Sequence, residues 1–233
     1  MANARALDKR RKSVRNIRKI TRTMELIATA RFKKAMDRAL AATSYTNRIT
    51  QLVKDLAQSG LEVKHPLLEA REATNNAVLL VLTANRGLCG GYNGSVIRQA
   101  IPRQHELAES IREVRLEISG KRGISALKFR GIEAAQSFTQ FEDQPRFDEV
   151  DEIASRYLDE FIAGRLDRLD VAYTQFHSIG KQVATVETLL PLGAIAGADE
   201  AETASQASPG ESMYEFLPSA ESILEKLFRP ASR

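Results

Sequence analysis

The first 59 residues contain neither glycine nor proline; the first of each are Gly60 and Pro66. Arginine, lysine, alanine, leucine and methionine dominate this stretch, and all of them are good helix formers. The sequence therefore predicts one helix over residues 1–59, on the order of 80 Å long at about 1.5 Å per residue. Helices in globular proteins average about 11–12 residues. One compact domain cannot cover so long a helix, so we expect other polypeptides along it.

A heptad repeat runs along this helix. One position of the repeat holds Leu7, Val14, Thr21, Ala28, Ala35, Ala42, Ile49 and Leu56. The second position holds Arg10, Ile17, Met24, Arg31, Arg38, Tyr45 and Leu52. The apolar band is widened on its flanks by Ile20, Ile27, Phe32 and Val53. Three arginines in the repeat make a strict two-stranded zipper a poor fit, so the pattern favours an asymmetric coiled coil inside a larger assembly.

The net charge of +4 is unevenly distributed along the chain. Residues 1–40 hold 13 Lys or Arg against 3 Asp or Glu, a net charge of +10, and the remaining residues carry a net charge of −6. A basic head on an acidic body predicts a negatively charged partner for the first segment. Nucleic acid, anionic lipid and acidic protein loops all fit that description.

Three interpretations of the basic helix stay open on these grounds. The helix could present a solvated charged face on a coiled-coil arm, it could be an arm that binds nucleic acid, or it could be a mitochondrial transit peptide. The nucleic-acid alternative lacks interleaved aromatic residues and any known docking module. The transit peptide ranks last, because the heptad phase runs from residue 7 to 56 without the break that a cleaved leader would leave.

The chain changes character after Gly60. The apolar run at residues 77–83 is typical of a strand buried on both faces of a parallel sheet. Further elements are expected at about 95 onward (a helix bent or shortened by Pro102), 114–119 (strand), up to 129 (helix), 135–141 (weak strand), 147–162 (helix), and 169–176 and 182–190 (strands). The last two strands are joined by a tight turn at Gly180, which predicts an antiparallel pair. The fold class is therefore α/β: a long N-terminal coiled-coil helix and a doubly wound, mostly parallel, five-stranded, Rossmann-like sheet.

These patterns divide the chain into four segments. We expect a helix at 1–59, an α/β domain at 60–193, a flexible acidic linker at 194–213, and the start of a helical segment at 214–233. The last segment is amphipathic over residues 220–228, through Ile223, Leu224, Leu227 and Phe228. No window holds 18 consecutive apolar residues, which argues against a transmembrane helix, and the basic N-terminus has no apolar run of a secretory signal behind it.

The glycine-rich stretch at residues 87–94 does not match a nucleotide-binding loop. It contains no lysine, so it is no Walker loop, and its glycines at 87, 90, 91 and 94 do not give the dinucleotide fingerprint. A second basic turn, Gly120-Lys-Arg-Gly123, opens a predicted helix and is a weak candidate for an anion site on backbone N–H groups. The simpler interpretation is a turn that needs positive φ angles.

Nothing else in the sequence indicates catalysis. Cys89 has no second cysteine for a CxxC pair, and His65, His105 and His177 are too far apart for metal-ligand spacing. No serine lies in a Gly-x-Ser-x-Gly elbow. We therefore expect no catalytic site, no metal and no cofactor in this chain.

Several stretches together resemble one known family. Residues 18–31 (RKITRTMELIATAR) resemble the N-terminal helix of the γ subunit of F-type, proton-translocating ATP synthases, and residues 83–93 (TANRGLCGGYN) resemble its loop after the first strand. The stretches HPLL at 65–68, GRLD at 164–167, LLPL at 189–192 and YEFLP at 214–218 follow in the family's order. The resemblance covers essentially the whole chain.

This resemblance implies a non-catalytic central-stalk rotor that couples proton-driven rotation of the c ring to ATP synthesis or hydrolysis at the β subunits. The first helix would lie inside the ring of α and β subunits, and the α/β domain would lie against the ε subunit and the c ring. The residues implied in partner contacts are Arg22, Met24, Arg31, Lys34, Arg86, Cys89 and Tyr214. The implied location is peripheral, on the cytoplasmic face of a bacterial inner membrane, with no nucleic acid and no small-molecule substrate of its own.

One departure from the family concerns the C-terminus. Members of the family continue past the position of Phe228 into a helix about as long as the first, whereas this sequence ends at Arg233. The unpaired heptad seam on residues 7–56 fits a missing partner helix. We therefore expect the sequence to be either a fragment or a truncated product.

Overall fold

The computed structural model describes residues 4–58, 67, 71, 73–141 and 145–192, and within the first helix it leaves out the side chains of 42, 44–47, 49, 50 and 52–58. The chain divides into two compact units, Met1–Leu52 and Val53–Arg233. The predicted linker at 194–213 and the segment at 214–233 lie outside the described residues.

Helix α1 runs without interruption over Ala4–Gln58. The prediction of a single long helix is confirmed, and 55 residues correspond to about 80 Å at the usual rise per residue. Short-range ion pairs add support on its surface: Arg11 pairs with Asp8 at 2.7 Å and Arg22 with Glu25 at 2.8 Å. Exposed pairs of this kind contribute only about 0–1 kcal/mol each, so they are a minor part of the stability of α1 beside the helix propensity of its residues.

The second unit is built on a five-stranded sheet in the order β3-β2-β1-β4-β5. Its elements in chain order are β1 (Asn76–Leu82), α2 (Tyr92–Ser110), β2 (Glu113–Ser119), α3 (Lys121–Phe129), β3 (Gln136–Phe138), α4 (Phe147–Ile162), β4 (Arg168–Ser178) and β5 (Lys181–Leu190). Strands β1 to β4 are parallel to their neighbours, and β5 is antiparallel to β4. The predicted α/β fold with a mostly parallel, five-stranded sheet is confirmed.

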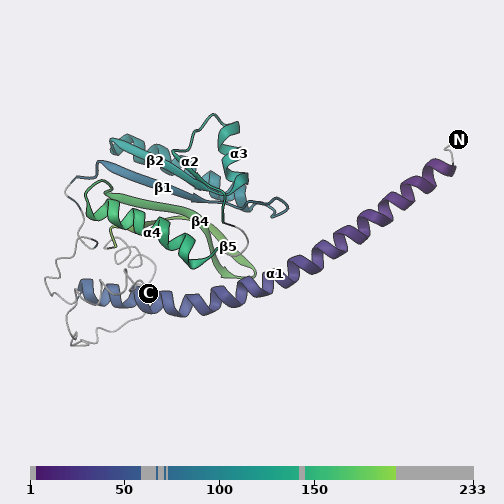
Figure 1. The fold of residues 1–233 in the computed structure, drawn as a ribbon, viewed down its shortest axis with the longest axis horizontal. Helices are drawn as coiled ribbons and strands as arrows, with labels where there is room; N and C mark the ends of the chain where they lie inside the picture. Colours follow the sequence, from purple (N-terminus) through teal and green to yellow (C-terminus); the bar gives the residue numbers. More distant parts are fainter. Residues whose placement is uncertain (1–3, 59–66, 68–70, 72, 142–144, 193–233) are drawn as a thin grey trace. The chain divides into compact units, whose positions relative to one another are not determined.

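The two faces of the sheet are covered by different helices, with α2 and α4 on opposite faces (Figure 1). Alternate residues of β1 point to opposite sides, which is the period of a strand. Leu79 and Val81 pack with α2 and Leu127 of α3 in one hydrophobic core. Leu80 and Leu82 face α4 instead. The chain therefore moves from β1 through α2 and α3 to one sheet edge and returns through α4 to the other.

Buried carboxylates join the helices to the sheet. Asp170 of β4 is fully buried and accepts hydrogen bonds from Arg103 of α2, Arg168 and Thr188, each at 2.8 Å. Asp167 accepts from the backbone N–H groups of Asn75 and Asn76, at 3.0 and 2.9 Å. A buried charge is tolerated only when it is paired and hydrogen-bonded, and these carboxylates meet that condition.

Some predicted boundaries are wrong. Strand β3 spans only 136–138 and not 135–141, because the side-chain amide of Asn85 donates to the carbonyl oxygens of Thr139 and Phe141, which a longer strand would place in the sheet. Helix α2 begins at Tyr92, three residues before the predicted start. It also continues beyond Pro102 to Ser110, so the proline does not shorten it.

Leu79 and Leu80 give a matched test of how the two faces are buried. Leu79 is fully buried, whereas Leu80 is partly exposed. We expect Leu79→Ala to lower the free energy of unfolding by about 2–5 kcal/mol, the usual cost of a large cavity in a core, and Leu80→Ala to cost clearly less. Urea unfolding followed by tyrosine fluorescence measures both, since the chain has no tryptophan. Equal losses would contradict the burial described for the two faces.

Candidate partner-binding surfaces

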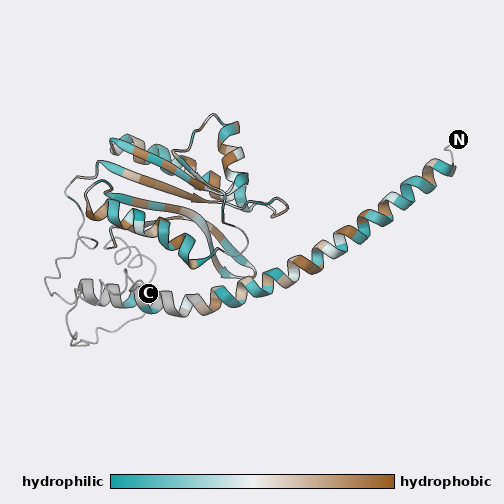
Figure 2. Cartoon of the chain, in the orientation of Figure 1, coloured by the Kyte–Doolittle hydropathy of each residue, from teal (hydrophilic) through white to brown (hydrophobic). Residues whose placement is uncertain are grey.

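An exposed apolar stripe follows one side of α1. Leu7, Val14, Ile17, Ile20, Met24 and Ile27 have exposed fractions between 46% and 60%. The spacing of Ile17, Ile20, Met24 and Ile27 by three and four residues places them on one face of a helix, over about 15 Å of its length. Figure 2 shows apolar and polar residues alternating along α1. Exposed aliphatic side chains in this spacing are the seam of a helix-packing surface.

The hydroxyl groups of threonines in and beside this stripe donate hydrogen bonds to backbone carbonyl oxygens of the preceding helical turn. Thr21 Oγ1 donates to the carbonyl oxygen of Ile17 at 3.1 Å, and Thr29 Oγ1 donates to that of Glu25 at 2.9 Å. A hydroxyl bonded within its own helix keeps a hydrogen-bond partner when the surface is covered. Packing a partner on the stripe therefore leaves these groups paired.

Several basic side chains are exposed on this part of α1. Arg31 and Lys34 are exposed, and Arg22 is exposed beside its partner Glu25. Among the residues predicted to contact partners, Arg22, Met24, Arg31 and Lys34 thus lie exposed within about three turns of α1. At about 100° per residue, Arg31 continues the line of Met24, Lys34 lies at the edge of the stripe, and Arg22 lies on the opposite side of α1.

The second candidate surface is the loop between β1 and α2, which is fixed by polar side chains at its ends. Thr83 Oγ1 donates to the carbonyl oxygen of Ser119 at 2.7 Å. The backbone N–H of Ala84 donates to Asn93 Oδ1 at 2.8 Å. Asn85 bridges to the loop after β3 through its amide nitrogen, as described above. These contacts clamp the base of the loop to the carboxyl ends of β2 and β3.

The weak anion-site hypothesis at Gly120-Lys-Arg-Gly123 is wrong. The N–H of Lys121 donates to Asn85 Oδ1 at 2.9 Å, that of Arg122 to the carbonyl oxygen of Ala84 at 3.2 Å, and that of Gly123 to Thr83 Oγ1 at 3.1 Å. The donors that would hold an anion at the start of α3 are therefore already used by the β1–α2 loop.

Two glycines allow this close contact. Gly120 has φ +103°, and a Cβ there would lie 2.2 Å from the carbonyl oxygen of Thr83. A Cβ at Gly123 would lie 2.3 Å from Thr83 Oγ1. The predicted positive φ is present at Gly120. At Gly123 a glycine is needed because Thr83 leaves no room for a side chain.

The tip of the loop is exposed and conformationally strained. Leu88 has φ +62°, a region that costs a non-glycine residue about 1–2 kcal/mol, and its side chain is 91% exposed. Arg86 and Cys89 beside it are exposed as well. Asn93 Nδ2 donates to Cys89 Sγ at 3.1 Å, and burial, with a smaller effect of Cys89, raises the pKa of Tyr92. Strained backbone conformations of this kind cluster at binding and catalytic sites, so the exposed Leu88 makes the tip a candidate contact.

The buried charges in the α/β unit have structural partners. Glu117 accepts from Arg156 at 2.6 Å and from the Tyr157 hydroxyl at 2.8 Å. The hydrogen bond to Glu117 is the main cause that raises the pKa of Arg156, and burial raises the pKa of Tyr157. The raised pKa values keep the Arg156 guanidinium charged and the Tyr157 phenol neutral near neutral pH, which suits a structural link between β2 and α4.

Within the described ranges, no group of three or more His, Cys, Asp or Glu side chains is arranged to hold a metal ion. None of the helices that the structure describes is both long and apolar enough to cross a membrane.

The predicted contact residues fall into three groups. Four lie on α1, and Arg86 and Cys89 lie at the tip of the β1–α2 loop. Tyr214 lies outside the described residues. Sequence reasoning did not single out Leu88 or the polar side chains of Thr83, Asn85 and Asn93. The signal for the latter was the placement of threonine and asparagine around a glycine-rich turn, where their side chains bond to nearby backbone.

The α/β unit and the long helix have counterparts among known proteins. The sequence profile of the ATP synthase family matches residues 3–231. The ATP synthase gamma chain of Rhodopirellula baltica is 64% identical over 228 residues, which cover 97% of this chain and 76% of that protein. The ATP synthase gamma chain of Leptospira biflexa (strain Patoc 1 / Ames) is 35% identical over the same shares.

A solved structure shares the fold. The central stalk and c ring of the Tetrahymena thermophila mitochondrial ATP synthase contains a chain that matches with a TM-score of 0.57 and 19% identity, over 81% of this chain and 80% of that one. A long helix joined to a mostly parallel α/β unit is the fold class that the two chains share. The sequence matches then give the particular family: the chain belongs to the ATP synthase gamma chains.

Gly120 and Gly131 allow the effect of a positive φ to be separated from the effect of close packing. Both have positive φ, but a Cβ at Gly131 would meet nothing within 4 Å. We expect Gly131→Ala to cost about 1–2 kcal/mol from backbone strain alone. Gly120→Ala should cost about 1–3 kcal/mol more, because its methyl group would collide with Thr83. Urea unfolding of both variants measures the difference, and an equal cost would contradict the packing of the two turns.

Proposed function

We propose that this chain is the central-stalk rotor subunit of an F-type ATP synthase, which couples proton-driven rotation of the c ring to ATP synthesis or hydrolysis at the β subunits. Membership in the gamma-chain family supports this function. The observation that carries it is the exposed apolar stripe of α1, because a helix with aliphatic residues about half exposed needs surrounding protein.

In this proposal α1 is part of a shaft inside the ring of α and β subunits. Met24 lies in the stripe, and Arg22, Arg31 and Lys34 face acidic loops of the β subunits. A shaft must meet three β subunits in turn, so its contacts have to be re-formed at each step of rotation. Exposed charge pairs are worth about 0–1 kcal/mol each and have loose geometry. Many weak, exposed charge pairs therefore break and re-form more easily than one deeply buried ion pair would.

The α/β unit has a different task. We place its β1–α2 loop against the ε subunit and the c ring, with Arg86, Leu88 and Cys89 as contacts, and Tyr214 toward the c ring by resemblance to the family. The clamp of Thr83, Asn85 and Asn93 supports this assignment, because a loop that transmits force needs a rigid base. The exposed Leu88 supplies apolar area, and Arg86 supplies charge.

The chain has no catalytic site of its own in this proposal, and ATP chemistry takes place on the β subunits. The saturated ion pairs of Glu117 and Asp170 support that division, since their partners fix them in structural roles. The segments 1–59, 60–193, 194–213 and 214–233 are the proposed shaft helix, α/β domain, linker and start of a second shaft helix. The complex would hold the chain peripherally at the cytoplasmic face of the bacterial inner membrane.

The nucleic-acid alternative makes a different experimental prediction. A nucleic-acid arm would bind duplex DNA with an affinity that falls steeply with salt. The rotor would instead co-purify with α and β subunits. Family membership favours the second outcome.

Met24 and Leu26 test the stripe directly. Both are exposed, at 46% and 59%, but two residues along a helix place them on opposite sides. We expect Met24→Lys in the assembled enzyme to lower ATP-driven proton pumping several-fold, since it adds a charge to the apolar seam next to arginines. Leu26→Lys should have a much smaller effect, and circular dichroism of both variants should match the parent. Equal losses of pumping would rule out the stripe as the contact face.

Leu88 and Phe129 test the loop. Both side chains are 91% exposed, one at the loop tip and one at the end of α3. We expect Leu88→Asp to reduce binding of the reconstituted F1 complex to membrane vesicles that contain c rings, because a charge replaces apolar contact area. Phe129→Asp should leave binding near the parent level. Loss of binding in the second variant alone would move the interface away from the loop.

A further inference from the structure

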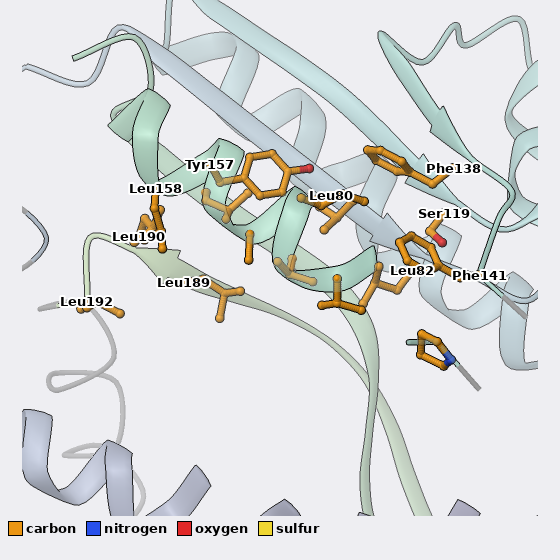
Figure 3. A pocket seen from close by; sticks show the side chains of 16 residues that line it. Leu80, Leu82, Ser119, Phe138, Phe141, Tyr157, Leu158, Leu189, Leu190 and Leu192 are labelled. Atoms are coloured by element: carbon orange, nitrogen blue, oxygen red, sulfur yellow. The ribbon is translucent and has the colours of Figure 1, made fainter. Parts of the chain in front are cut away.

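The α4 face of the sheet contains an open apolar groove of about 570 Å³, a volume within the range of small-molecule sites. Strands β1 and β4 line it from the sheet, and α4 lines it from the opposite side (Figure 3). No charged side chain is found among the described residues that line it. Because charged and strongly polar groups are costly to bury without partners, the groove favours an uncharged, mostly apolar occupant.

One end of the groove carries a polar side chain. Leu82, Ser119 and Phe138 are register partners on the neighbouring parallel strands β1, β2 and β3. All three line the groove, so they form a row across its end. Ser119 is only 8% exposed, and Figure 3 shows its hydroxyl oxygen at the end of the groove that Phe138 and Phe141 border. The groove therefore combines a long apolar wall with one buried hydroxyl.

The Ser119 hydroxyl is available for a ligand. The carbonyl oxygen of Ser119 accepts hydrogen bonds from the N–H and the Oγ1 of Thr83, at 2.8 and 2.7 Å. In contrast, no residue in the described part of the chain forms a hydrogen bond with its side-chain oxygen. The phenol of Tyr157 in the same lining is already used, because it donates to Glu117 at 2.8 Å. Buried waters usually make about three hydrogen bonds, so this single hydroxyl is a poor water site.

Two aromatic rings border the same end. The ring centroids of Phe138 and Phe141 are 6.3 Å apart, and the ring planes are tilted by 49°. Aromatic rings attract one another in tilted and offset arrangements at centroid distances of about 4.5–7 Å. A third ring that enters the groove can pack against this pair. The neighbourhood of Ser119 therefore favours an aromatic ligand over an aliphatic one.

We propose that the groove binds a small, uncharged aromatic molecule that carries one hydroxyl or carbonyl group. Its ring packs against Phe138 and Phe141, and its polar group forms a hydrogen bond with Ser119 Oγ. The remaining apolar part of the molecule lies along Leu80 and Leu82 of β1. This site is separate from the α1 stripe and from the β1–α2 loop, so the proposal does not rest on the rotor function.

An extended peptide is the main competing occupant. Each of its residues would bring a backbone N–H and a C=O group into the groove, and these groups need partners when they are buried. Ser119 is the one side chain with a free polar group among the described residues of the lining. A small ligand with one polar group matches this limited supply of hydrogen bonds, whereas a peptide strand does not.

A pair of ligands and a serine variant test the hydrogen bond. Equilibrium dialysis of the full 233-residue chain against 2-naphthol and against naphthalene measures binding with and without a ligand hydroxyl. We expect Ser119→Ala to weaken 2-naphthol binding about three- to tenfold, the usual effect of losing one neutral hydrogen bond, and to leave naphthalene binding within about twofold. Circular dichroism confirms that the variant is folded. No binding of 2-naphthol to the parent chain, or an equal change for both compounds, overturns the proposal.

A matched pair of α4 variants tests the groove itself. Ala154 lines the groove, whereas Ser155 does not, and both are exposed. We expect Ala154→Phe to fill the space and to weaken binding of both compounds at least tenfold. Ser155→Phe adds the same ring outside the groove and should leave both affinities near the parent values. Equal effects of the two substitutions, or no effect of Ala154→Phe, would place the bound molecule elsewhere and contradict the proposal.

Nuclear magnetic resonance locates the ligand directly. In the methyl-labelled full chain, the ring protons of 2-naphthol should show nuclear Overhauser effects to the methyl groups of Leu82 and Val150, which line the groove. Ile17 and Ile27 of the exposed α1 stripe should show none. Contacts confined to the stripe would mean non-specific apolar binding and would overturn the site. None of these measurements uses ATP synthase activity, so failure here is distinct from failure of the rotor function.

Discussion

The burial of β1 organises the α/β unit. This strand pairs in parallel with β2 on one side and β4 on the other, and its side chains enter the layers on both faces. Because parallel strands need crossover connections, the position of β1 determines that α2 and α4 lie on opposite faces. The end of β1 also sets where the next loop begins, so the candidate contact loop directly follows the central strand of the sheet.

That loop combines rigidity at its base with exposure at its tip. Thr83, Asn85 and Asn93 use their side chains to hold the backbone of neighbouring turns. Gly120 and Gly123 let the turn after β2 approach closely enough for those bonds to form. The same contacts occupy the N–H donors that an anion would need, so one arrangement both stiffens the loop and excludes phosphate binding at the start of α3.

Both units leave apolar surface that the described residues do not cover. On α1 the surface is a long stripe of exposed aliphatic side chains, with Arg31 in the same line. On the α4 face it is a groove without charged lining. The two surfaces differ in chemistry: basic side chains lie among the residues of the stripe, whereas the lining of the groove is apolar or aromatic apart from Ser119.

Local sequence patterns alone were enough to predict much of the secondary structure of this protein. The absence of glycine and proline over residues 1–59 was enough for one long helix, and the apolar run at 77–83 was enough for a buried central strand, because helix propensity and strand burial are properties of contiguous residues. The order of short motifs also placed the chain in its family. The same reasoning overestimated β3, since its end depends on Asn85, which is more than fifty residues away in the chain.

Only the tertiary structure decided which groups are free to bind. Whether the N–H groups at Lys121 and Gly123 could hold an anion depended on side chains about forty residues earlier, and the incomplete cover of Leu80 depended on how far α4 extends over the sheet. Such contacts join residues distant in sequence, so no local pattern encodes them. Hydrogen-bond saturation and surface coverage are properties of the packed chain, and they decide which backbone and apolar groups remain available for binding.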